Sequence, residues 1–302
     1  MAKYCIGALI YENRTRQKIT QEELCDGICT ATTLSKIENG QQLPRRKTFE
    51  ALVQRLGISE QCCFFPVSDN EMRRSNLEFR ITRELSTGNY DILDLLEQYK
   101  ECGERMGTME EQFYFQSMAM ITLGKGGIYQ EARHLLMKSI YLTIPHFSIP
   151  MPERYKLLTF DEIRIMNSIA IVEYQIGNTE NAITLMFYLK DYMNRNNIDL
   201  EEKAKLYPMI LYNLSNWMGK ERRDELAYTL CEEGIDFCIQ NGKLSVFPFL
   251  IFNKGYSLAR MSRLKEAVPY IRQACTIFEA LKDQKRADMC RQEIEQSFSI
   301  HL

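Results

Sequence analysis

Residues 20–40, TQEELCDGICTATTLSKIENG, decide the fold of the N-terminal part of this 302-residue chain. Thr20 and Glu23 have the spacing of a capping box, in which the threonine hydroxyl accepts from the Glu23 amide while the Glu23 carboxylate reaches back. A short helix is therefore expected from Gln21, with Leu24 and Ile28 facing inward.

A second short helix is expected directly after it. Thr30 is a suitable N-cap for a helix from Ala31 to Glu38, and Asn39-Gly40 supplies the left-handed conformation that ends such a helix. Two short helices joined by a tight turn, the second presenting small polar side chains, predict a helix-turn-helix.

Amphipathic segments flank this hairpin on both sides. Residues 4–17 predict a helix with Ile6, Leu9 and Ile10 on one face. Beyond Pro44, residues 46–56 predict a fourth helix whose apolar stripe is Phe49, Leu52, Val53 and Leu56. These stripes give the hairpin a small core of its own.

The second helix of the hairpin is the candidate DNA-reading helix. Its methyl groups suit thymine, its hydroxyls suit several base edges, and Lys36 is long enough to reach guanine acceptors. Gln21 is expected to meet a phosphate, as is the basic cluster of Arg45, Arg46 and Lys47. The expected contacts from the reading helix are Thr30, Ala31, Thr32, Thr33, Ser35 and Lys36.

The pattern T-Q-E-E-L-x₃-I-C-x₄-L-S-K-I-E-N-G, from Thr20 to Gly40, resembles the XRE-type (lambda-repressor-like) helix-turn-helix. A chance helical hairpin explains the apolar positions but not the capping box, the small polar face and the Asn-Gly stop in one register. The short Ile28-Cys29 turn is similar to the PlcR branch of the PlcR/Rgg/PrgX peptide-pheromone regulators. The resemblance implies a DNA-binding homodimer that responds to a peptide.

The charge of the N-terminal segment also favours a dimer. Residues 1–66 hold nine Lys and Arg against seven Asp and Glu, a net charge of +2. That is a weak electrostatic footprint for a lone DNA-binding unit. Two copies on the half-sites of a near-palindromic operator gain through effective concentration.

Composition indicates an all-α protein. Glycine (15) and proline (8) are scarce, and apolar residues recur at helical spacing among charged ones. A net charge of −2 excludes a polybasic protein that coats nucleic acid or membranes. No apolar run approaches the roughly 20 residues of a membrane-spanning helix. Residues 4–11 are followed by charged residues and no cleavage pattern, so a cytoplasmic protein is expected.

Neither a catalytic nor a metal site is expected. The sequence contains no nucleophile elbow, no phosphate-binding glycine loop and no metalloprotease motif, so we expect no enzyme and no cofactor. The ten cysteines form no Cys-x-x-Cys pair, and they are expected to be reduced, mostly buried thiols.

Beyond residue 76 a turn motif recurs. Each copy ends with a small or apolar residue, which we call its closing position. The closing positions are Leu93, Ala132, Ala182, Ala227 and Ala267, and a loop at residues 144–152 accounts for the longest interval. This pattern resembles tetratricopeptide (TPR) repeats. It predicts about five helix pairs in a right-handed superhelix, with a terminal capping helix over residues 284–298.

The first helices of such pairs line a groove that commonly binds peptides. Asparagine is a mediocre helix former, and its amide can pair with peptide N–H and C=O groups. Asn167 and Asn213 lie in segments similar to those from which PlcR-like proteins offer asparagine to their peptide. In the alternative, these asparagines bridge neighbouring helices or face water. The expected peptide contacts are Gln116, Arg164, Asn167, Tyr174, Asn213, Asn216, Asn253 and Tyr256.

We therefore expect a helix-turn-helix domain at residues 1–66, a linker at 67–76 and a TPR-like domain at 77–302. The expected function is transcriptional regulation, with a short peptide in the repeat groove controlling DNA binding. The alternative is an interaction protein whose groove takes a segment of a partner protein, with DNA binding regulated by that complex.

Overall fold

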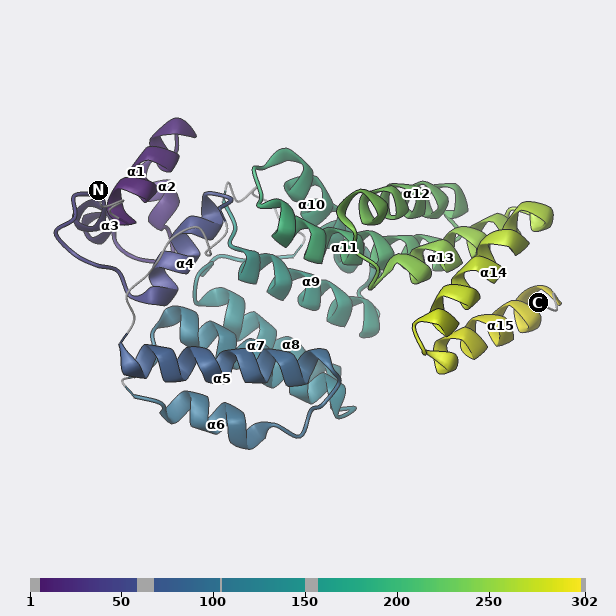
Figure 1. Ribbon diagram of the computed structural model, residues 1–302, viewed down its shortest axis with the longest axis horizontal. Coiled ribbons are helices and arrows are strands. Elements are labelled where there is room, and N and C mark those ends of the chain that lie inside the picture. The colour runs from purple at the N-terminus through teal and green to yellow at the C-terminus, as the bar shows by residue number, and fades with distance from the viewer. Residues whose placement is uncertain (1–5, 59–67, 104, 150–156, 300–302) are drawn as a thin grey trace. The chain divides into compact units, whose positions relative to one another are not determined.

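The computed structural model describes residues 6–58, 68–103, 105–149 and 157–299, and every regular element in those ranges is a helix (Figure 1). The chain forms two compact units, one of residues 1–185 with 195–199 and one of residues 186–194 with 200–302. The expected all-α fold class is confirmed.

The first unit begins with four short helices, α1 (Ile6–Arg16), α2 (Gln21–Cys25), α3 (Ala31–Glu38) and α4 (Arg46–Arg55). The capping box of Thr20 and Glu23 is present, and Thr30 caps α3. Gly40 ends α3 with a left-handed φ of 71°. The helix-turn-helix predicted from these local signals is confirmed. Its core residues are Ile6, Ile10, Leu24, Cys25, Leu34, Ile37, Phe49, Leu52, Val53 and Leu56.

The rest of the first unit consists of α5 (Asp69–Ser86), α6 (Leu93–Glu101), α7 (Thr108–Gly124), α8 (Tyr129–Tyr141), α9 (Phe160–Gln175) and the first part of α10 (Thr179–Arg195). Helix α5 packs on α6 and α7, and α8 packs on both α7 and α9. Helix α5, capped by Ser68, begins inside the segment expected as a linker. The domain boundary at residue 66 stays a prediction.

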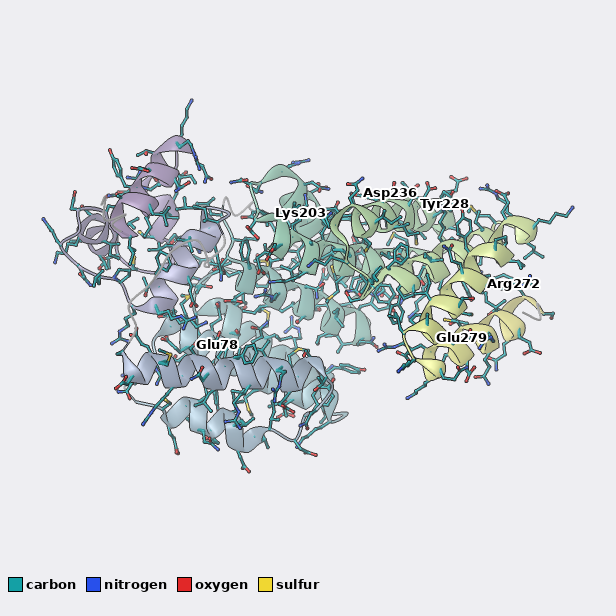
Figure 2. The ribbon with its side chains drawn as sticks, in the orientation of Figure 1. Glu78, Lys203, Tyr228, Asp236, Arg272 and Glu279 are labelled. Carbon is teal, nitrogen blue, oxygen red and sulfur yellow. The ribbon has the colours of Figure 1, made fainter. Side chains whose placement is uncertain are left out.

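The second unit contains α11 (Leu200–Lys220), α12 (Asp224–Asn241), α13 (Phe247–Arg260), α14 (Leu264–Ala280) and α15 (Gln284–Phe298). Each helix packs on the next, and α13 also contacts α11 and α15. These three helices therefore form one layer, as the first helices of successive TPR pairs do. The terminal helix occupies the residues expected for it. Arg291 of α15 pairs with Glu279 of α14, and Figure 2 labels Glu279.

Four of the five closing positions pack as expected. Ala132, Ala182, Ala227 and Ala267 are each the fourth residue of their helix and fully buried. The assignment of Leu93 is wrong, because it is the first residue of α6 and 44% exposed. Leu96 is the fourth residue and is fully buried. In the first copy of the turn motif, the buried closing position is therefore Leu96, three residues after the position expected from the sequence.

The loop after α8 is partly described, and residues 150–152 of the expected stretch lie outside the described residues. Ile144 and Phe147 are buried. A Cβ built on Gly27 would lie 1.9 Å from the Thr143 carbonyl oxygen, and Gly27 has a φ of 69°. Only glycine fits there, so the turn between α2 and α3 rests directly on the backbone at the end of α8.

A buried ion pair fastens α4 to α9. Arg55 Nη2 lies 3.1 Å from Glu162 Oε1, and the two side chains are 3% and 0% exposed. The Gln54 Oε1 atom accepts from the Phe160 backbone N–H at 3.0 Å. Arg55 also donates to the carbonyls of Leu24 and Asp26. The helix-turn-helix is therefore joined to α9 by buried polar contacts.

This ion pair generates a stability prediction. Arg55→Met leaves the Glu162 carboxylate buried without its cation, so we expect the free energy of unfolding to fall by about 3–5 kcal/mol. Arg55→Met/Glu162→Gln removes both charges and keeps an acceptor for the Thr159 backbone N–H, which Glu162 binds at 2.7 Å, so we expect it to recover most of that loss. Urea denaturation followed by circular dichroism measures both.

Arg83→Met is the matched control, because the side chain of Arg83 is 62% exposed and pairs only at the surface. We expect it to change stability by less than about 0.5 kcal/mol. A double variant no more stable than Arg55→Met would contradict the assigned role of the pair.

Candidate functional site

Helix α3 exposes some of the residues expected to read DNA and partly buries the others. Thr32 and Lys36 are exposed, while Ala31, Thr33 and Ser35 are half-buried. The Thr30 hydroxyl accepts from the Thr33 backbone N–H at 3.1 Å and lies 2.9 Å from the Thr33 hydroxyl. Thr30 thus secures the start of the helix, where short side chains allow close approach of a partner surface.

Glu38 at the end of α3 organises the first three helices. It accepts from Arg14 Nε at 2.6 Å and Arg14 Nη2 at 3.0 Å, and it raises the pKa of Arg14 by this hydrogen bonding. Gln21, expected at a phosphate, donates its amide to Glu38 Oε2 at 2.6 Å. The structure therefore gives Gln21 a partner within the domain.

The basic cluster of Arg45, Arg46 and Lys47 lies at the start of α4, and its members differ in exposure. Arg45 is exposed. Arg46 donates to Glu50 at 2.6 Å and to Ser75 on α5 at 2.8 Å. Lys47 pairs with Glu50 and with Glu78, which projects from α5 (Figure 2).

These contacts set the charge state of Lys47. Burial alone lowers its pKa, but the carboxylates of Glu78 and Glu50 raise the pKa well above its ordinary value. The cations of Arg46 and Lys47 are thus used to join α4 to α5. Arg45 and Lys36 are the exposed cations among the expected DNA contacts.

The second unit contains a cavity of about 350 Å³ lined only by α11, α13 and α15. This is the layer of first helices that the repeat pattern predicted as a groove. The cavity brings together Asn216, Asn253 and Tyr256 of the expected peptide contacts. Asn253 donates to Ser215 Oγ of α11 at 3.1 Å, so it also bridges neighbouring helices, as the alternative for these asparagines supposed.

The other expected peptide contacts lie elsewhere. Asn213 is half-buried on α11 and outside the cavity lining. In the first unit, Gln116 is half-buried on α7, and α9 carries Arg164, Asn167 and Tyr174. Asn167 is 7% exposed, and Arg164 pairs with Asp161 at 2.8 Å. Their roles stay predictions.

The cavity also contains charged residues that the sequence analysis missed. Lys220, Arg260, Arg286 and Glu293 all line it. Arg260 follows Asn253 and Tyr256 at steps of three and four residues along α13, a spacing that places all three on one helical face. Following that helical face in the sequence to its charged residues would have identified Arg260 as a further candidate site residue. Burial raises the pKa of Glu293, and the Lys220 ammonium opposes this shift.

The described residues supply neither a metal site nor a membrane span. No group of three or more metal-ligating side chains gathers among them. The helices in these ranges are too short or too polar to cross a bilayer. Cys25, Cys29, Cys102, Cys231, Cys238, Cys275 and Cys290 carry free thiols.

Comparison with known proteins identifies the N-terminal part of the chain. Residues 10–61 match the Helix-turn-helix family, so this part is an XRE-type helix-turn-helix DNA-binding domain. No curated protein matches the sequence significantly.

Solved structures show the fold of the whole chain. PlcR of Bacillus thuringiensis, in complex with the peptide PapR7 and DNA, is 17% identical with a TM-score of 0.60, over 95% of this chain and 98% of PlcR. The apo form of the competence regulator ComR from Streptococcus vestibularis is 16% identical with a TM-score of 0.53, over 97% of both chains. The fold implied by the PlcR-type resemblance is confirmed.

The geometry of α3 generates a prediction for DNA binding. Lys36→Ala removes an exposed cation from the reading helix, so we expect binding to a duplex selected from a random pool to weaken by about 1–3 kcal/mol. We also expect the base preference at one position of each half-site to relax. Fluorescence anisotropy and repeated selection measure these two effects.

Lys265→Ala is the charge-matched control, since Lys265 is exposed on α14 of the second unit. We expect Lys265→Ala to leave both the affinity for the selected duplex and the base preference unchanged. Equal losses in the two variants would show that Lys36 contributes net charge and no base contact.

Proposed function

We propose that this chain is a homodimeric, cytoplasmic transcriptional regulator that binds a near-palindromic operator and whose DNA binding is controlled by a short peptide. The observation that carries the proposal is the polar and aromatic cavity lined by α11, α13 and α15, in a chain that also carries a helix-turn-helix domain.

The cavity has the chemistry that an extended peptide needs. Asn216 and Asn253 supply amide donors and acceptors that suit a peptide backbone, and Tyr256 supplies an aromatic ring beside a hydroxyl. The volume lies at the lower end of the roughly 300–1,000 Å³ range of ligand pockets. In the PlcR structure a peptide and DNA are bound together, and a ComR structure from S. thermophilus likewise contains DNA and a signalling peptide.

In the homodimer, two helix-turn-helix domains, which we call the DNA-binding heads, together supply the affinity for DNA that one of them lacks. A segment with a net charge of +2 binds DNA weakly alone, whereas two heads on half-sites about one helical turn apart bind as one ligand. Peptide binding would change the curvature of the repeats or the dimer, and so the spacing of the heads. A peptide does this only if its affinity differs between the two arrangements.

Helix α9 is a physical route for such a signal within the first unit. Glu162 at its start holds Arg55 of α4, and the expected peptide contact Asn167 lies five residues further along the same helix. A shift of α9 would therefore displace α4 directly, through the Arg55–Glu162 ion pair.

The alternative class is an interaction protein whose groove accepts a segment of a partner protein. The two proposed functions are distinguished by the ligand that stays bound to the chain when it is purified from its host. Native mass spectrometry of the recovered chain should show a bound peptide of about 5–10 residues, since peptide grooves take short extended segments. A stoichiometric protein partner would instead favour the alternative.

Variants in the cavity test the peptide site. We expect Asn216→Ala/Asn253→Ala to lose the bound peptide, because both amides that line the cavity are removed. The melting temperature checks that the fold is retained. Asn241→Ala is the control, since Asn241 donates to the Phe237 carbonyl on α12 and lies outside the cavity. Full peptide occupancy in the double variant would contradict the assignment of this cavity.

A further inference from the structure

Helix α5 presents an outward face on which large apolar side chains are exposed. Phe79 is 68% exposed, and Met72, two turns earlier on the same side of the helix, is 50% exposed. Arg73 and Arg80 follow these two residues directly in the sequence and are exposed as well. Apolar side chains grouped among cations in this way indicate a surface that a partner covers.

The two arginines of this face, which we call the basic row, have no counter-ion. Neither Arg73 nor Arg80 forms an ion pair or a side-chain hydrogen bond with another described residue. Glu84, one turn beyond Arg80, is bound by Arg83 and by Asn89. The two arginines are seven residues apart, which is two helical turns or about 10 Å along the helix.

Helix α6 packs on α5 (Figure 1) and carries a row of the opposite charge. Asp94 and Glu101, which we call the acidic row, are both exposed and are also seven residues apart. Neither forms an ion pair with another described residue, although Glu101 lines the same hollow as Arg73 and Arg80. This hollow between the two helices has a volume of about 430 Å³. Charges of both signs are therefore left unpaired on neighbouring helices.

The arrangement of the two rows indicates the kind of partner. A polyanion such as DNA or an anionic membrane is attracted by the basic row but repelled by the acidic row beside it. A fitting partner instead presents an acidic row next to a basic row, with the same spacing of two turns. A second copy of this chain presents that pattern, and a two-fold axis brings each row of one copy onto the opposite row of the other.

We propose that the outward face of α5 and α6 is the dimer interface of this chain, in which the basic row of each copy pairs with the acidic row of the other. The inference rests on the homodimer of the proposed function. Phe79 of each copy then projects toward the hollow of the other, where arginine side chains stack on its ring. The aromatic contact contributes affinity, and the charged rows fix the register of the two copies.

Reversing each row in turn tests the interface. Arg73→Glu/Arg80→Glu reverses the basic row. Asp94→Lys/Glu101→Lys reverses the acidic row. We expect each variant alone to dimerise about a hundredfold more weakly than the original full-length chain, because like charges then face each other in both halves of the interface.

An equal mixture of the two reversed variants provides the decisive measurement. In the mixed dimer each reversed row faces the other reversed row, so we expect the mixture to dimerise as well as the original chain. Sedimentation velocity measures dimerisation. The melting temperature checks the fold, and we expect it to stay unchanged because the four substituted side chains are exposed.

Two further variants serve as controls. Lys265→Glu/Arg272→Glu reverses two exposed cations that are also seven residues apart, on α14 of the second unit, where Figure 2 labels Arg272. We expect this variant to dimerise like the original chain. Phe79→Ala leaves all charges in place, and we expect it to weaken dimerisation by about tenfold.

The possible outcomes separate this inference from the proposed function. An original chain that stays monomeric overturns both the interface and the proposed homodimer. A dimer that both reversed variants retain, or that their mixture fails to restore, overturns the interface alone. If a reversed variant loses its fold, Phe79→Ala decides, since unchanged dimerisation of that variant overturns the interface.

Discussion

The buried Arg55–Glu162 ion pair is the contact on which the rest of the first unit depends. Arg55 also donates to the carbonyls of Leu24 and Asp26, so one guanidinium joins the end of α2, helix α4 and helix α9. Removing either charge leaves the other buried without its counter-ion. The helix-turn-helix is consequently held in a defined position on the repeat helices, together with the contact of Gly27 on Thr143.

The ion pairs of α4 also reduce the number of cations that the helix-turn-helix domain presents to DNA. Arg46 and Lys47 neutralise carboxylates of α4 and α5, so the outward face of α3 is left with Lys36 and the small polar residues around it. The net charge of only +2 over residues 1–66 leaves the general attraction of this segment to phosphates weak. In the proposed homodimer, the spacing of the two helix-turn-helix domains would therefore govern binding.

Local signals predicted most of the fold. The bounds of α3, the capping box at Thr20 and the buried alanines of the repeats all depend on residues close in sequence, and each was confirmed. Leu93 was misassigned because leucine suits both an exposed first turn and a buried position, whereas alanine marks a close helix contact.

The partners of individual side chains could not be predicted in this way. Gln21 bonds to Glu38, and Lys47 pairs with Glu78, 31 residues away. The cationic lining of the cavity likewise joins helices separated by tens of residues, so no local pattern marks it. Three expected peptide contacts meet in the cavity because the repeat spacing brings equivalent positions of α11 and α13 together.

The most direct test of the central claim is selection of bound sequences from a random duplex pool by the full-length chain, with and without the small-peptide fraction of the host's spent culture medium. We expect an inverted repeat with half-sites about one helical turn apart, enriched to an extent that depends on the peptide fraction. Enrichment of an inverted repeat that is indifferent to the fraction would contradict peptide control. Failure to enrich any sequence in either arm would contradict the regulator itself.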